Sequence, residues 1–144
     1  MREVINSIIA GISIALNQEF GDGCKNYTEE VKQGLEEPCF FISCIHPTHK
    51  LLRGRRYFQE NMFCIQYFPA DEGRAKEECH AVAGRMFSCL EWITADGALV
   101  RGTGRNAEIE DGILNFFVNY DLLFRRAEDT GPMEEISENV SAKG

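Results

Sequence analysis

The chain has 144 residues, of which 44% are apolar and 26% charged, and its formal net charge is −8. This length fits one domain that buries roughly 70% of its unfolded surface in a single core. The acidic balance argues against general affinity for nucleic acid or anionic membranes, and no apolar run approaches the roughly 20 residues that cross a bilayer. Because Arg2-Glu3 is a poor n-region for a signal peptide, we expect a cytoplasmic, uncleaved protein.

The first third of the chain predicts a helix followed by two strands. Residues 3–18 place large apolar side chains at helical spacing, and Ile14 lies off this stripe, which indicates a contact on a second helix face. Gly21-Asp22-Gly23 ends the helix. Cys24–Val31 is predicted as a short edge strand, and the almost wholly apolar Cys39–Ile45 as a buried strand near the middle of a sheet.

A basic segment separates that buried strand from the next one. His46–Arg56 combines a proline, two histidines, one lysine, three arginines and a glycine, and we interpret it as a long basic hairpin connection. Tyr57–Phe68 is predicted as the partner strand, with Phe63, Ile65 and Tyr67 on one face. Hairpin loops usually take two to five residues, so the extra length of this connection indicates an interaction role.

The second predicted helix spans Arg74–Ile93, where apolar residues from Ala75 to Ile93 follow the three-four spacing of an amphipathic helix. Asp96-Gly97 is a tight-turn signature. Leu99–Arg101 and Arg105–Glu110 are predicted as short strands. We interpret the nearby glycines 97, 102 and 104 as turn and bulge residues, because they match no phosphate-binding motif.

The longest strand pattern is Ile113–Phe124, and the rest of the fold is organised around it. Its even-numbered positions are all apolar or aromatic, whereas Asn115, Asn119 and Asp121 lie on the other face. Asp111-Gly112 turns the chain into this strand. One apolar face needs a cover, and we expect both helices to supply it, with the even face packed against Ile8, Ile12, Val82, Met86 and Leu90.

These elements predict an α+β fold with the order α-βββ-α-βββ. The sheet is expected to be mostly antiparallel, with about five to six strands and both helices on one face. We expect a single domain over residues 1–126. Residues 127–144 hold five acids against one lysine, with few large apolar residues, and are expected to form a flexible acidic tail.

Catalytic and metal-binding patterns are weak. Cys79 and His80 are helix neighbours whose side chains diverge, so Cys79 is expected to face the core and His80 the solvent. Cys44, His46 and His49 form the best metal-ligand cluster, although a fourth ligand must come from elsewhere. The six cysteines are expected to be reduced, small buried hydrophobes. We therefore expect no catalytic residue, no cofactor and no bound metal.

One basic patch stands out in this acidic chain, formed by Lys50, Arg53, Arg55 and Arg56. It is open to three interpretations: a solvated hairpin tip, an anchor for an acidic protein surface, or a small nucleic-acid site. Arginine forms bidentate pairs with carboxylates, which favours an interface. Two aromatic residues beside the patch, Tyr57 and Phe58, can stack on bases, but they more simply begin a strand.

Several blocks together resemble a known family. They are INSIIAGISIALNQEFGDG, YTEEVKQGLEEPCFFI, RYFQENMFCIQYFP and GALVRGTGRNAEIEDGILNFFVNYD. Together they resemble the phage tail terminator family, which is found in tail-gene clusters of phages and of Gram-positive, especially clostridial, prophages. The resemblance covers about Val4–Phe124. It contains no short motif, so no residue role is carried over from the family.

The resemblance implies a small α/β fold that assembles into a ring, usually a hexamer, on the last ring of the tail tube. Such a ring stops tube polymerisation and joins the head-completion protein, in the host cytoplasm and then in the virion tail. A basic projection in a ring needs an acidic receiver on its neighbour, and the candidates are Glu29, Glu30, Glu77 and Glu78. The alternatives are a small metal-binding or enzymatic domain using Cys44, His46 and His49, or a dimeric nucleic-acid-binding α+β module.

Overall fold

A computed structural model of the chain describes residues 4–28, 36–45, 47–51, 54 and 56–125. The chain forms two α-helices, two 3-10 turns and nine strands among these residues: α1 (Val4–Phe20), η1 (Gly21–Gly23), β1 (Lys25–Tyr27), β2 (Cys39–Cys44), β3 (Thr48–Leu51), β4 (Arg56–Glu60), β5 (Met62–Phe68), η2 (Glu72–Arg74), α2 (Ala75–Cys89), β6 (Trp92–Ala95), β7 (Ala98–Glu110), β8 (Ile113–Tyr120) and β9 (Leu122–Arg125).

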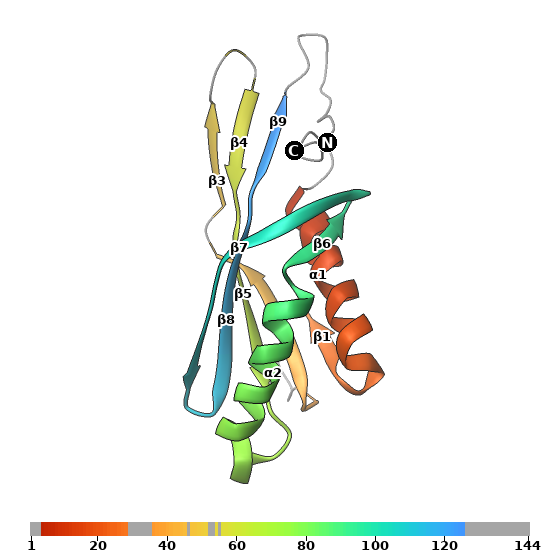
Figure 1. The fold of residues 1–144 in the computed structure, drawn as a ribbon, viewed down its shortest axis with the longest axis vertical. Coiled ribbons are helices and arrows are strands. Elements are labelled where there is room, and N and C mark those ends of the chain that lie inside the picture. The colour runs from red at the N-terminus through yellow and green to blue at the C-terminus, as the bar shows by residue number, and fades with distance from the viewer. Residues whose placement is uncertain (1–3, 29–35, 46, 52–53, 55, 126–144) are drawn as a thin grey trace.

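The strands form two sheets. The core sheet has six strands in the order β1-β2-β5-β8-β7-β6, in which β1 runs parallel to β2 and every other pair is antiparallel. The second sheet has three strands in the order β3-β4-β9, and we call it the arm. Figure 1 shows the arm extending from one end of the core sheet, with both helices beside the core sheet. The predicted α+β fold, with its mostly antiparallel sheet and two helices, is confirmed.

The even face of β8 lies at the centre of the core. Leu114, Phe116, Val118 and Tyr120 are fully buried and belong to one apolar cluster with the α1 residues Ile8 and Ile12 and the α2 residues Val82 and Met86. Leu90, which follows α2, belongs to the same cluster. The alternation of β8 therefore predicted the correct buried face, and both helices cover it.

Two aspartate-glycine pairs turn the chain between antiparallel strands. Asp96 and Gly97 have φ values of 55° and 84°, and Asp111 and Gly112 have 53° and 76°. Two consecutive positive φ angles define the type I′ turn, whose twist matches that of the flanking strands. The predicted tight turn at Asp96-Gly97 is confirmed, and so is the predicted hairpin at Asp111-Gly112, which joins β7 to β8. The pairing of β6 with β7 around the first turn was not predicted.

The end of the second helix was predicted wrongly. α2 stops at Cys89, and Ile93 lies in β6 instead of on the helical stripe. Ile93 is buried in either case, so its burial did not distinguish a helix from a strand. Contacts from distant strands hold the chain in the new direction, because Tyr120 Oη donates to Leu90 O over 2.6 Å and Gly102 N donates to Glu91 O over 2.7 Å.

Strand β7 joins two strands that were predicted separately. It runs unbroken from Ala98 to Glu110, and its register against β8 shifts between Thr103 and Asn106. Gly104 lies in this irregular stretch with a φ of 59°, which agrees with its predicted role as a bulge glycine. The bulge absorbs the change in register, so the ladder to β8 continues on both sides of it.

Three further boundaries differ from the sequence prediction. His46–Arg56 is not a simple connection, because Thr48–Leu51 forms β3 and pairs with β4. The predicted strand Tyr57–Phe68 breaks at Asn61, and Ile113–Phe124 breaks at Asp121. The predicted edge strand is described only as β1, since residues 29–35 lie outside the described part of the chain.

Candidate functional site

The junction between the core sheet and the arm is held by Asn61, which is fully buried. Its side-chain Nδ2 donates to Tyr120 O over 3.0 Å, and Gln59 Nε2 donates to its Oδ1 over 3.0 Å. The backbone of Asn61 donates to Asp121 Oδ1 over 3.3 Å and accepts from Tyr120 N over 2.9 Å. The two strand breaks therefore face each other, and each side chain satisfies backbone groups that the interrupted ladders leave open.

Asp121 is electrostatically unusual at this junction. Burial raises the pKa of its carboxyl group above the ordinary value of 3.8, the hydrogen bond from Asn61 N lowers it, and the charge of Glu60 raises it further. The net effect favours the protonated form. The junction thus places a carboxyl group of reduced acidity where β8 passes into the arm.

The arm brings basic residues into register. β4 pairs with β9 so that Arg56 lies directly opposite Arg125, and β3 pairs with β4 so that Lys50 lies opposite Phe58. The structure thus places Lys50 and Arg56 of the predicted patch on one sheet, whereas Arg53 and Arg55 lie outside the described residues. The arginine pair is new, since the sequence does not show which strand β9 joins.

The predicted acidic receivers differ in their surroundings. Glu77 is exposed on α2. Glu78 accepts hydrogen bonds from Tyr67 Oη over 2.6 Å, Ala70 N over 3.0 Å and Asp71 N over 3.3 Å. It therefore ties the loop after β5 to α2 within its own chain. Glu29 and Glu30 lie outside the described residues.

The glutamate Glu78 and its donor Tyr67 shift each other's ionisation. Burial alone raises the pKa of the Glu78 carboxyl, but the hydrogen bonds from Tyr67, Ala70 and Asp71 outweigh it and hold that pKa below 4.5. Burial, followed by the hydrogen bond to Glu78, raises the pKa of the Tyr67 hydroxyl. At neutral pH the Glu78 carboxylate is therefore ionised and accepts the hydrogen bonds that hold the loop after β5.

The cysteines lie in environments that disfavour the reactive thiolate. Burial raises the pKa of all six thiols, to about 11 for Cys39 and Cys89. Cys79 is buried and the neighbouring His80 is exposed, as predicted. Of the candidate metal ligands, Cys44 ends β2 and is half-buried, whereas His46 lies outside the described residues. No group of three or more candidate ligands gathers within the described ranges.

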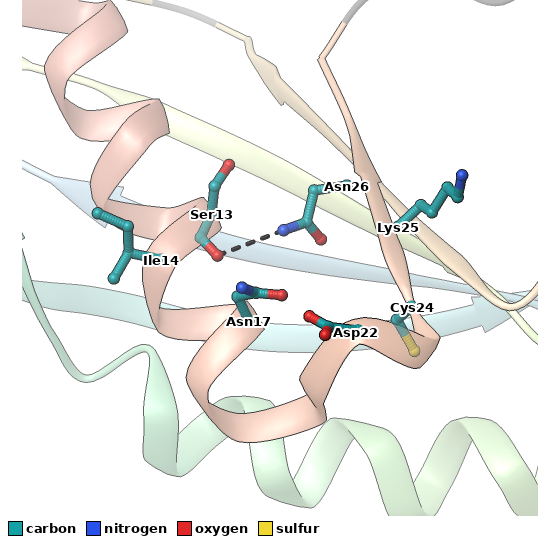
Figure 2. A pocket seen from close by; sticks show the side chains of 7 residues that line it. All are labelled: Ser13, Ile14, Asn17, Asp22, Cys24, Lys25 and Asn26. Carbon is teal, nitrogen blue, oxygen red and sulfur yellow. Dashed lines mark hydrogen bonds between the residues drawn. The ribbon is translucent and has the colours of Figure 1, made fainter.

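Two surface features were missed by sequence reasoning. Trp92 and Leu99 on the β6–β7 hairpin are 49% and 58% exposed. A shallow pocket of about 460 Å³ lies between α1, η1 and β1, as Figure 2 shows. Its lining residues are Ser13, Ile14, Asn17, Asp22, Cys24, Lys25 and Asn26. Ile14 is 57% exposed there, so its place off the main helical stripe was the one signal for this pocket in the sequence.

The fold and its projecting arm define a small α+β protein that presents contact surfaces. The sequence model of the family described as phage tail terminator protein matches residues 7–132. The chain therefore belongs to the phage tail terminator family, a family of structural phage proteins. The recognition made from the sequence blocks is confirmed.

Comparisons outside the family model add little. No curated protein matches the chain. One solved structure covers 88% of this chain and 98% of its own, with 12% identity and a TM-score of 0.41, which is too low to support a functional inference. No helix within the described residues is long and apolar enough to cross a membrane.

Proposed function

We propose that this protein caps the phage tail tube as a hexameric ring. In this role it stops tube polymerisation and offers its other surface to the head-completion protein, without catalysis or a cofactor. Its partners are further copies of itself, the tube protein and the head-completion protein. Assembly takes place in the host cytoplasm, and the protein remains in the virion tail. Membership of the tail terminator family supports this role.

The observation that carries the proposal is the basic arm. A cap must bind the end of the tube with one side and must not bind further tube subunits with the other. It therefore needs two different contact surfaces. The arm extends beyond the layer formed by the helices and the core sheet, and its register opposes Arg56 to Arg125. Such a projection reaches a neighbouring molecule while the core stays intact, and its charge selects an acidic receiver.

The receiver on the neighbouring subunit is proposed to include Glu77. This residue is exposed on α2, whereas Glu78 is already engaged by three donors of its own chain. Glu29 and Glu30 remain candidates from the sequence. Surface charge pairs of this kind contribute mainly to the rate and specificity of association, and added salt weakens them.

The direct test is tube length. Purified tube protein is polymerised with and without this protein, and the lengths are measured by negative-stain electron microscopy. The wild-type protein is expected to give short, uniform tubes. Reversal of Arg53, Arg55 and Arg56 to glutamate is expected to keep the fold but weaken self-association or tube capping, and added salt is expected to reproduce part of this loss.

A matched pair of double variants separates the arm from general charge effects. Arg55→Glu with Arg56→Glu changes the charge as much as Arg74→Glu with Lys76→Glu does, and both Arg74 and Lys76 are exposed outside the arm. The control pair lies beside the proposed receiver Glu77 and leaves that receiver acidic, so only the arm variant is expected to lengthen the tubes. Equal capping by both variants means that the arm is only a solvated hairpin, and failure of the wild-type protein to limit tube length contradicts the capping role itself.

A further inference from the structure

We infer that the pocket beside β1 receives Trp92 and Arg101 from a second copy of this chain. The inference rests on the proposed ring and adds a contact that is separate from the basic arm. It is drawn from three observations: an unsatisfied acceptor in the pocket, a preorganised pair of donors on the β6–β7 hairpin, and the placement of the two on different faces of the protein.

The pocket holds acceptors and an exposed apolar side chain. Asn26 Nδ2 donates to Ser13 O over 3.3 Å, whereas Asn26 Oδ1 is buried and has no hydrogen-bond partner among the described residues. A buried acceptor without a donor is destabilising, so the site gains from an incoming donor. Figure 2 shows Asn17, Asp22 and Asn26 gathered between α1 and β1, whereas Ile14 projects from another side of α1.

The β6–β7 hairpin presents donors that match this pocket. Trp92 lies directly opposite Arg101 in the strand register, and the Arg101 guanidinium lies 5.8 Å from the centre of the Trp92 ring. Arg101 Nη2 also lies 3.5 Å from Glu91 Oε2, a long contact on the surface. The indole N–H and the guanidinium are both donors only. Tryptophan and arginine are the residues most enriched in interface hot spots.

The donors and the pocket lie on different faces of one protomer. Ile93 is buried, and its Cδ1 lies 3.3 Å from the position that a Cβ on Gly11 of α1 would take. Successive strand side chains point to opposite faces, so Trp92 points away from α1, whereas the pocket is lined by α1 itself. A protomer therefore does not fill its own pocket with Trp92.

Two different complementary surfaces on each copy give a head-to-tail contact, and such contacts form a ring when the rotation between successive copies closes. Asn26 Oδ1 has almost no exposed surface, so the indole N–H of Trp92 supplies its missing donor as the Asn26 side chain turns toward the pocket. The Arg101 guanidinium complements the exposed carboxylate of Asp22, and Leu99 supplies apolar surface next to Ile14. Leu99 is diagonal to Trp92 in the register, so one docked hairpin presents all three side chains.

The experiment is a charge-swap cycle on the full chain. Self-association is measured by sedimentation velocity over a range of concentrations, alone and with purified tail tubes, and tube lengths are measured in parallel. Arg101→Glu and Asp22→Arg are each expected to weaken association about tenfold, and their combination is expected to restore most of it. Trp92→Ala is expected to weaken association about 30-fold, the size of a hot-spot truncation of roughly 2 kcal/mol.

Arg74→Glu serves as the control, because it makes the same charge change at an exposed arginine outside the contact and is expected to leave association unchanged. Thermal unfolding of each variant confirms that the fold is kept. Restored association in the double variant supports the contact. The contact is contradicted if the single variants associate like the wild type, or if the double variant associates no better than the single variants. If the wild-type protein still caps tubes normally, the proposed function is unaffected by that result. Wild-type protein that neither associates nor caps tubes overturns both.

Discussion

The three arm strands and three of the six core strands come from the same three stretches of chain, yet they differ in what they bury. β2, β5 and β8 lie side by side in the core sheet, and β3, β4 and β9, their chain neighbours, form the arm. The core strands bury fully enclosed side chains such as Phe63 and Phe116 under the two helices, whereas Phe58, Gln59 and Glu60 of β4 are only half-buried. Stability is therefore concentrated in the core sheet, and the arm is free to carry charge for contact.

The first prediction compares the loss of a buried aromatic side chain in the core sheet with the loss of a half-buried one in the arm. Phe116 is fully buried, and its ring lies 5.0 Å from that of Phe87 on α2. We expect Phe116→Ala to lower the free energy of unfolding by about 3–5 kcal/mol, through lost burial and the cavity left behind. Phe58→Ala in the arm is the matched control, with an expected loss of about 1 kcal/mol. Urea unfolding measures both, and equal losses mean that the arm contributes to stability as much as the core.

The second prediction compares two glycines. A Cβ on Gly102 in β7 would lie 2.7 Å from Leu90 O and 2.8 Å from Val118 Cγ2, so Gly102→Ala is expected to cost about 1–3 kcal/mol by overpacking. Gly54, between β3 and β4, has open space around its Cβ position but a φ of 59°. Gly54→Ala is therefore expected to cost about 1 kcal/mol through backbone strain alone. Thermal unfolding tests both, and a neutral Gly102→Ala contradicts the close packing of α2 on β7.

The third prediction concerns the pH dependence of the core. The folded state holds the pKa of Glu78 below its ordinary value of 4.5. The unfolded chain therefore binds the proton more readily, and the contribution of Glu78 to stability is present above about pH 4.5 and lost as pH falls through the lowered pKa. Glu78→Gln is expected to lose about 1 kcal/mol at pH 7. Its difference from the wild type should shrink toward pH 3, and a constant difference across this range contradicts the assignment.

The fourth prediction has the smallest expected effect and concerns Asp121 at the junction, where the pKa shift is opposite in direction to that of Glu78. The pKa of Asp121 is raised above 3.8 in the folded state, so the folded protein binds this proton more readily than the unfolded chain. Stability is therefore lost as pH rises through the window above 3.8. Asp121→Asn keeps an oxygen to accept from Asn61 N, and we expect it to match or exceed the wild type by a few tenths of a kcal/mol at pH 7.

The measurement for Asp121 is urea unfolding at pH 3 and pH 7. The advantage of the asparagine variant should appear only at the higher pH. A loss of stability at pH 7 means that the negative charge itself holds the junction. In that case the core sheet and the arm are coupled more tightly than the half-buried residues of β4 indicate.

The sequence alone was sufficient for features that depend on local repetition. The alternation along β8 identified the buried residues Leu114, Phe116 and Val118, because strand side chains alternate between faces whatever lies next to them. Asp96-Gly97 identified a tight turn and Asp111-Gly112 identified a hairpin, since their positive φ angles are a property of the turn itself. The sequence blocks also identified the tail terminator family.

Only the tertiary structure decided where the strands break and which surfaces face outward. Asn61 and Asp121 are 60 residues apart in the chain, and neither alone predicts the hydrogen bond that ends both strands at one place. The same holds for Ile93, whose strand is held by contacts that the two residues after α2, Leu90 and Glu91, make with Tyr120 and Gly102. The Arg56–Arg125 register also joins distant segments. Local periodicity determines which residues are buried, whereas pairing between distant strands determines the surfaces available to a partner.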